Sequence, residues 1–191
     1  MPVIEQSDLV IRRMRDEPQD YALVSKWLSD ERVLEFVYGR DNAFDLDRVH
    51  TRFGPRVRGE SEVVPCILEF DDTPVGYMQY YPVEDGERYG IEDIGEAAFG
   101  IDMFIGEPDV WNLGGGTRAM KMLVGHLFSA LGAARLVIDP RAENKRAIRC
   151  YEKSGFKKFK VLARHELFEG AHRDIWVMAM TNADDSRSVV A

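Results

Sequence analysis

The sequence has 191 residues, which is enough for one domain with a sizeable core and too few for two domains of ordinary size. Its formal net charge of -8 argues against nucleic acid as a partner, because an acidic protein repels the phosphate backbone. The 2 cysteines lack the spacing of a disulfide framework or a structural zinc site. No secretory leader opens the sequence and no apolar run could cross a bilayer, so we expect a cytoplasmic protein without a membrane segment.

The first half of the chain alternates between strand and helix patterns. Tyr21, Val24 and Trp27 recur at helical spacing after the acidic, proline-containing stretch 16–18, which predicts a helix. The other elements expected in this half are a strand over 8–13, a short helix through 33–36, a helix from 45 that carries Leu46, Val49 and Phe53, and a hairpin of strands 62–70 and 75–81.

The second half predicts further strands alternating with two helices. The expected elements are strands over 97–105, 135–138, 156–163 and 174–180, a helix over 144–154, and a helix over 117–131 whose apolar face is Met120, Leu123, Val124, Leu127 and Leu131. This order predicts an α/β (α+β) fold with a mixed sheet and at least one parallel crossover. We expect 1–181 to form a single domain and the small, polar residues 182–191 to form a flexible tail.

A long acidic loop is expected over 82–96, between two of these strands. Its one basic residue is Arg88, and its acidic residues are Glu84, Asp85, Glu87, Glu92, Asp93 and Glu96. A segment with this charge attracts cations where it borders a binding site.

Residues 111–118, WNLGGGTR, form a glycine-rich run between a predicted strand and a predicted helix. Glycines let the backbone approach a ligand closely, and the unpaired N–H groups at a helix start suit an anion such as a pyrophosphate. A plain connecting turn has a similar composition, so the run alone leaves both interpretations open. It lacks the lysine of a nucleotide-binding P-loop, which argues against NTP hydrolysis.

Residues 139–156, DPRAENKRAIRCYEKSGF, carry the second pattern. Ala147, Ile148 and Tyr151 share one helix face by their spacing of three and four. The simplest interpretation of Tyr151 is a core aromatic, with the neighbouring basic residues on a solvated face.

Together, these two segments resemble the acetyl-CoA-binding half of the GNAT acetyltransferase superfamily. The glycine run looks like its pyrophosphate loop, and 144–156 look like its second cofactor motif, N-x-x-A-I-R-x-Y-E-K-x-G-F. Segments 27–36, 99–102, 104–108 and 165–170 are similar to the aminoglycoside 6'-N-acetyltransferases, so the resemblance covers nearly the whole chain. It implies a GNAT fold, with a mixed, mostly antiparallel central sheet of six to seven strands, flanked by helices and splayed at the acetyl-CoA site.

The resemblance also implies a set of contacts to acetyl-CoA, which would act as a cosubstrate. Trp111 stands where the family usually has Arg or Gln, and Gly115 is an unusual middle residue of the loop. Asn144 matches a position that hydrogen-bonds the pantetheine arm, although capping its own helix is an equally good interpretation. The expected cofactor-binding residues are Met103, Phe104, Ile105, Trp111, Asn112, Gly114, Gly115, Gly116, Thr117, Arg118, Asn144, Ala147 and Tyr151.

The same resemblance implies two catalytic residues, Asp102 and Tyr151. Asp102 matches the aspartate proposed to take a proton from the acceptor amine, and it lies in an otherwise apolar strand, where a carboxylate needs a partner or a purpose. An outward-facing aspartate, or one paired with a structural arginine, is the alternative. Tyr151 matches the acid that protonates the departing CoA thiolate, with simple packing against the thioester as its alternative. Neither cysteine has a nucleophile motif, so direct transfer in a ternary complex is favoured.

The acceptor that the resemblance implies is the 6'-amine of a polycationic aminoglycoside, a reaction of antibiotic resistance. Asp139 matches an acceptor-binding acid of those enzymes, although a turn aspartate before proline is an equally good interpretation. The expected acceptor-binding residues are Asp102, Asp139, Glu92, Asp93, Glu96 and Tyr38. The 4 histidines are scattered, so no metal is expected. Monomer and homodimer both remain open.

Two alternatives to this function remain. The first keeps the chemistry and changes the acceptor to a siderophore-precursor hydroxylamine, a polyamine or a protein amine. The second is a non-catalytic protein that binds acetyl-CoA or a cationic drug. The acidic loop favours a polycation over an amino-acid derivative, and the presence of Asp102 and Tyr151 argues against a non-catalytic protein.

Overall fold

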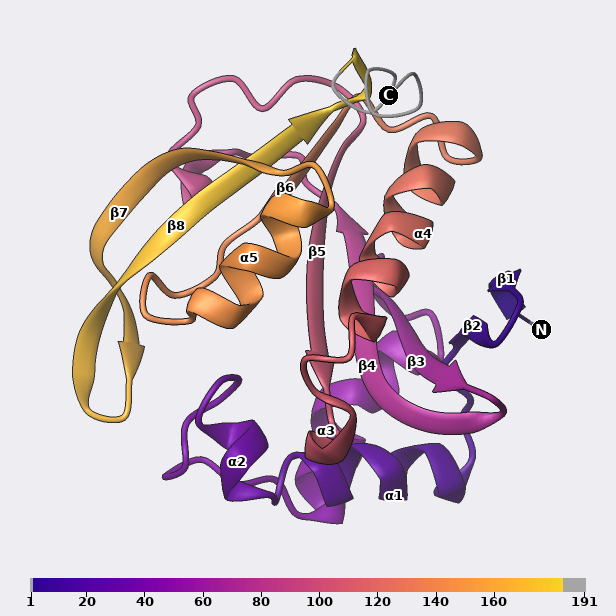
Figure 1. The fold of residues 1–191 in the computed structure, drawn as a ribbon. Coiled ribbons are helices and arrows are strands. Elements are labelled where there is room, and N and C mark those ends of the chain that lie inside the picture. Colours follow the sequence, from indigo (N-terminus) through magenta and orange to yellow (C-terminus); the bar gives the residue numbers. More distant parts are fainter. Residues whose placement is uncertain (1, 184–191) are drawn as a thin grey trace. The chain divides into compact units, whose positions relative to one another are not determined.

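The computed structural model describes residues 2–183 and contains an 8-stranded sheet with the order β1-β2-β3-β4-β5-β6-β8-β7 (Figure 1). The β5–β6 ladder is parallel, and the β1–β2, β2–β3, β3–β4, β6–β8 and β7–β8 ladders are antiparallel. The predicted mixed, mostly antiparallel sheet is therefore confirmed, with one strand more than expected. No helix in the described range is long and apolar enough to cross a membrane.

The chain forms two compact units. The first comprises Met1–Tyr81 and Asp102–Ala119, and the second comprises Pro82–Ile101 and Met120–Ala191. The single domain expected over 1–181 stays a prediction. The tail expected over 182–191 lies outside the described residues from 184 onward.

The first unit opens with the unexpected strand β1, Pro2–Gln6, which pairs with β2 across a tight turn. Ser7 in that turn has a φ of 55°, a left-handed value for which serine gives no clear sequence signal. The strand itself lacks an alternating apolar pattern, so periodicity does not reveal it. The other elements of this unit are β2 Leu9–Arg13, α1 Pro18–Trp27, α2 Glu31–Leu34, α3 Leu46–Val57, β3 Val64–Phe70, β4 Thr73–Pro82 and η2 Pro108–Val110.

The core of the first unit packs α1 and α3 against β3 and β4. The stripe predicted for α1 is confirmed, because Tyr21, Val24 and Trp27 are each at most 1% exposed. In α3, Phe53 is fully buried, whereas Leu46 is 45% exposed. Leu46 is the first residue of α3, so the apolar face of that helix begins later than expected.

A buried ion network ties β2 to α1 and β3. Arg12 on β2 donates to both carboxylate oxygens of Asp20 on α1, at 2.6 and 2.8 Å, and to Glu69 on β3 at 2.6 Å. Asp20 also accepts from the backbone N–H of Arg15 at 2.7 Å. Arg12 and Asp20 are only 7% and 3% exposed, so each charge depends on the other for its stabilisation.

The second unit contains the acidic loop and most of the second-half elements. Its α4 starts and ends two residues earlier than the expected 117–131, and Leu131 lies past its end at 43% exposure. The elements are η1 Glu87–Tyr89, β5 Ala98–Ile105, α4 Gly115–Ser129, β6 Arg135–Ile138, α5 Lys145–Lys153, β7 Lys157–Phe168 and β8 Ala171–Thr181. The end of β5 and the first turn of α4 belong to the first unit.

Strands β7 and β8 form a hairpin that is longer than the two strands expected there (Figure 1). The two turn residues, Glu169 and Gly170, have φ values of 46° and 72°. Two consecutive positive φ values are the backbone of a two-residue hairpin turn. Glutamate rarely adopts a positive φ, which is why no turn was expected at this position.

Replacing Asp20 by alanine is expected to lower the free energy of unfolding by about 3–5 kcal/mol, because Arg12 then stays buried without its partner. Glu60→Gln is the matched control, since Glu60 pairs with Arg58 at 2.6 Å on the surface, where ion pairs contribute little. Urea denaturation of both variants measures the difference. Equal midpoints for the two variants would show that the Arg12 network does not stabilise the fold.

Candidate active site

A chain of hydrogen bonds in the first unit ends at Asp102. Gln79 on β4 donates from Nε2 to Oδ2 of Asp102 on β5 at 2.6 Å. Its Oε1 accepts from Arg56 of α3 at 2.6 Å and from the hydroxyl of Tyr77 at 2.7 Å. One helix and two strands therefore meet at a single side-chain amide, which is 7% exposed.

The donors fix the orientation of the Gln79 amide. An arginine side chain can only donate, so the carbonyl end of the amide faces Arg56 and the NH₂ end is left for Asp102. Burial raises the pKa of Tyr77 well above its ordinary value, so its hydroxyl stays protonated through the neutral pH range. The amide thus holds one oxygen of Asp102 in a defined position.

The other carboxylate oxygen of Asp102, Oδ1, accepts no hydrogen bond from any residue in the described range. The side chain is half-buried in an otherwise apolar strand. The partner of this carboxylate is Gln79 and not a structural arginine, and its catalytic role stays a prediction. An ionised carboxylate with one oxygen held and one available can accept an N–H group and its proton.

Close packing anchors the end of β5 to α1. A Cβ atom on Gly106 would lie 2.1 Å from Trp27 Cγ, so only glycine fits there. The next residue, Glu107, accepts from Trp27 Nε1 at 2.8 Å and from Lys26 at 2.5 Å. Burial alone would raise the pKa of Glu107, but these two hydrogen bonds outweigh burial and lower it. The backbone that follows Asp102 is thereby fixed in place.

The backbone of 103–105, expected to pair with the pantetheine amides, lies beyond the β5–β6 ladder, which covers Ala98–Gly100. Trp111 Nε1 donates to the carbonyl of Ile105 at 2.8 Å, and its ring packs edge-on against Phe36 with 6.0 Å between centroids. Trp111 therefore supports the strand end from within the protein. Contact between its side chain and the cofactor stays a prediction.

The glycine run forms the start of α4 in a conformation that depends on its small residues. Asn112 and Gly114 have φ values of 64° and 88°, and the helix begins at Gly115. A Cβ atom on Gly115 would lie 2.6 Å from Phe70 Cζ, so a side chain there requires the Phe70 ring or the loop to move. The N–H groups of a helix start and the helix dipole suit an anion such as a pyrophosphate, and glycines allow its close approach.

Arg118 ties the first turn of α4 to the turn between β1 and β2. Its Nη1 and Nη2 donate to the two carboxylate oxygens of Asp8 at 2.9 and 2.5 Å. Hydrogen bonding to Arg118 lowers the pKa of Asp8 to about 2. The guanidinium expected to bind the cofactor is thus already paired within the protein, and its cofactor contact stays a prediction.

Helix α5 of the second unit carries the other candidate catalytic residue. Asn144 accepts from the backbone N–H of Ala147 at 3.0 Å, which makes it the N-cap of α5. Tyr151 is 5% exposed and packs edge-on against Phe156, with 6.2 Å between centroids. Because Asp102 and Tyr151 belong to different units, their joint action stays a prediction.

The acids expected to bind the acceptor differ in their surroundings. Asp139 accepts from Arg88 of the acidic loop at 3.1 Å, so an internal cation already pairs with it. Glu92, Asp93 and Glu96 are exposed, and Asp93 accepts from a backbone N–H in its own turn at 3.0 Å. Their contact with an acceptor stays a prediction.

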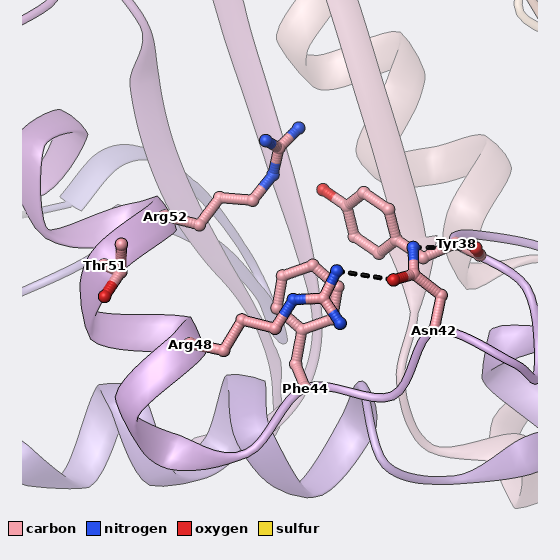
Figure 2. A pocket seen from close by; sticks show the side chains of 6 residues that line it. All are labelled: Tyr38, Asn42, Phe44, Arg48, Thr51 and Arg52. Atoms are coloured by element: carbon pink, nitrogen blue, oxygen red, sulfur yellow. Dashed lines mark hydrogen bonds between the residues drawn. The ribbon is translucent and has the colours of Figure 1, made fainter.

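Tyr38, expected to contact the acceptor, lines a pocket of about 540 Å³ in the first unit (Figure 2). The pocket lies between α3 and the segment that precedes it. Its lining residues are Tyr38, Asn42, Phe44, Arg48, Thr51 and Arg52.

Groups for metal or thiol chemistry are few in the described range. Within 2–183, no three His, Cys, Asp or Glu side chains are placed to hold a metal ion. Cys66 is fully buried, and burial raises the pKa of its thiol to about 12. A thiol of that kind is a poor nucleophile at neutral pH.

Three residues of the hydrogen-bond chain, Gln79, Arg56 and Tyr77, were not expected from the sequence. Gln79 is the one amide in the apolar stretch 75–81, and that isolation is the signal that could have found it. Arg56 has no such signal, because α3 carries several arginines and only the folded chain selects one of them for Gln79.

Proteins similar to this chain in sequence and structure include acetyltransferases. The chain is 31% identical over 157 residues to aminoglycoside N(6')-acetyltransferase type 1 of Klebsiella pneumoniae, across 82% of this chain and 78% of that protein. It is 26% identical over 153 residues to N(6)-hydroxylysine O-acetyltransferase of Escherichia coli, across 78% of this chain and 46% of that protein. The crystal structure of aminoglycoside acetyltransferase AAC(6')-Ib with coenzyme A and kanamycin matches with a TM-score of 0.78 at 26% identity, over 95% of this chain and 99% of that one.

The sequence pattern of the acetyltransferase (GNAT) domain matches residues 16–163. This range includes Asp102, the glycine run and Tyr151, so the match covers both segments on which the resemblance rested. The chain therefore belongs to the GNAT acetyltransferase family.

Proposed function

We propose that this protein transfers the acetyl group of acetyl-CoA directly to the 6'-amine of an aminoglycoside antibiotic. Membership of the GNAT family supports the acetyl transfer, and the aminoglycoside-modifying relatives support the acceptor. The observation that carries the proposal is the Asp102 carboxylate. One of its oxygens is held by Gln79, and the other accepts no hydrogen bond within the described residues.

Acetyl-CoA supplies the acetyl group as a thioester. A sugar amine is largely protonated at neutral pH, so it must lose a proton before it can attack the thioester carbon. In the proposed reaction, Asp102 accepts an N–H from the ammonium group and takes its proton. The amine then forms the C–N bond as the C–S bond breaks.

Residues outside the hydrogen-bond chain complete the proposed reaction. The phenol of Tyr151 gives its proton to the departing thiolate, which becomes the free thiol of CoA, and the proton that the nitrogen loses as the amide forms restores the phenol. The backbone N–H groups at the start of α4 hold the pyrophosphate, in the conformation that Gly114 and Gly115 allow. A backbone N–H within 103–105 polarises the thioester carbonyl.

A second candidate acceptor is an amine or hydroxylamine of an amino-acid derivative. Arginines rather than acids line the pocket at Tyr38, and Arg88 already pairs with Asp139. The first observation favours an acceptor that carries a negative charge, and the second weakens the attraction of Asp139 for a cationic acceptor. The similarity to N(6)-hydroxylysine O-acetyltransferase supports the same candidate.

Replacing Asp102 by asparagine is expected to lower kcat by about 100-fold or more, because the variant cannot take the proton of the ammonium group. The dissociation constant for acetyl-CoA should stay close to that of the wild type. CoA release with kanamycin measures the first quantity and calorimetric titration the second. Asp109→Asn, at an exposed position shortly after β5, is the matched control and should keep full activity.

A loss of acetyl-CoA binding in Asp102→Asn would make Asp102 a structural residue and contradict the proposed mechanism. If the enzyme acetylates lysine-derived hydroxylamine but not kanamycin, the proposed acetyl transfer stands and the acceptor is the second candidate instead of the aminoglycoside.

Replacing Gly115 by alanine is expected to weaken acetyl-CoA binding by about tenfold or more, because the new methyl group meets the Phe70 ring and narrows the space at the glycine run. Gly125→Ala is the matched control in the same helix, since a Cβ atom there meets no other atom within 4 Å. Calorimetric titration with acetyl-CoA measures both affinities. Equal affinities for the two variants would exclude the glycine run as the pyrophosphate site.

A further inference from the structure

Helix α3 carries three arginines on one face. Arg48, Arg52 and Arg56 recur at every fourth residue, so their side chains lie above one another along the helix. Like charges at this spacing destabilise a helix. The row therefore needs an explanation beyond helix formation. Arg56 has one in its hydrogen bond to Gln79, and the other two arginines line the pocket at Tyr38.

The pocket has the size and the polar groups of a small-molecule site. Its volume of about 540 Å³ lies in the ordinary range for such sites. Two guanidinium groups, a phenol, an amide and a hydroxyl line it beside one apolar aromatic ring, and none of the 6 lining residues is acidic. The local charge is therefore positive in a chain whose formal net charge is -8.

Arg48 is held in place by its neighbours (Figure 2). It donates to Asn42 Oδ1 at 2.5 Å and to the carbonyl of Ala43 at 2.9 Å. Its guanidinium lies 4.0 Å from the centroid of the Phe44 ring. A side chain fixed in this way loses little conformational freedom when a ligand binds.

Arg52 presents its donors to the pocket. Its guanidinium lies 5.6 Å from the Tyr38 ring centroid, and Figure 2 shows it reaching toward the hydroxyl end of that ring. Among the residues that the structure describes, neither the Arg52 side chain nor the Tyr38 hydroxyl makes a hydrogen bond or an ion pair. A planar guanidinium beside a phenol is suited to a carboxylate, which can accept from both.

We propose that this pocket binds a carboxylate of the molecule whose amine is acetylated. Along the arginine row, Arg52 at the pocket lies about 6 Å of helix from Arg56, and Gln79 links Arg56 to Asp102. An acceptor long enough to pass Arg56 and the Gln79 amide places its carboxylate at Arg52 and its amine at Asp102. The inference rests on the proposed acetyl transfer at Asp102, and it develops the second candidate acceptor, the amino-acid derivative, in place of the aminoglycoside.

The test uses two acceptors, lysyl-glycine and its C-terminal amide, which differ in one negative charge. The wild type should favour the acid by about tenfold or more in kcat/KM, the effect of a charged hydrogen bond. Arg52→Gln should bring this ratio close to one by raising KM for the acid alone, and Arg52→Lys should give an intermediate ratio. Arg58→Gln removes an equal charge from the surface end of the same helix and should keep the wild-type ratio.

A wild-type ratio of one or less, or a ratio that Arg52→Gln leaves unchanged, would overturn the proposal. A drop in kcat/KM for kanamycin in Arg52→Gln would also contradict it, because a polycation gains nothing from a guanidinium. Failure of the proposed acetyl transfer is a separate outcome, in which no amine releases CoA. Carboxylate binding in the pocket is then tested by calorimetric titration. The wild type must bind lysyl-glycine more tightly than its amide, and Arg52→Gln must abolish that difference.

Discussion

The side-chain amide of Gln79 is the constraint on which the chemistry of the first unit depends. A buried amide needs partners at both ends, because an unpaired polar group in the interior costs about 1–3 kcal/mol. Arg56 and Tyr77 satisfy the carbonyl end, which leaves the NH₂ end for Asp102. Gln79 is separated from Arg56 and from Asp102 by 23 residues each, so the orientation of the candidate base is set by tertiary structure.

Core packing decides which arginine of α3 reaches that amide. The ring of Phe53 packs edge-on against Tyr77 with 5.2 Å between centroids, and this contact fixes α3 against β4. Since Tyr77 also donates to Gln79, the same contact places Arg56 at the amide. The preceding turns of α3 then present Arg48 and Arg52 to the pocket. A change in the core beneath α3 would therefore move the hydrogen-bond chain and the pocket together.

Local patterns predicted the elements well and the contacts of the site poorly. Helical spacing found α1 and α3, and the unusual setting of Asp102 identified it as a residue that needs a partner. Neither helical spacing nor the apolar setting of Asp102 identifies Gln79 as its partner, because Gln79 lies on another strand. Trp111 shows the same limit, since its place in a cofactor motif gives no sign that its indole holds the Ile105 carbonyl. Strand β1 was not predicted, because its apolar residues do not alternate and the turn that follows it has a serine at positive φ.

Which acceptor binds depends on the distribution of charges around the site, and the formal net charge of the chain does not reveal that distribution. Exposed loop acids such as Glu92 and Glu96 are screened by salt over about 8 Å at physiological ionic strength. Asp139 already pairs with Arg88, which reduces its attraction for a further cation. The guanidinium groups of Arg48 and Arg52 instead line one pocket, so their charges converge on a single site. A family shares its chemistry at the reacting atoms, whereas acceptor choice lies in the side chains around them. At 31% identity to an aminoglycoside enzyme, the chemistry at the reacting atoms can persist while the choice of acceptor changes.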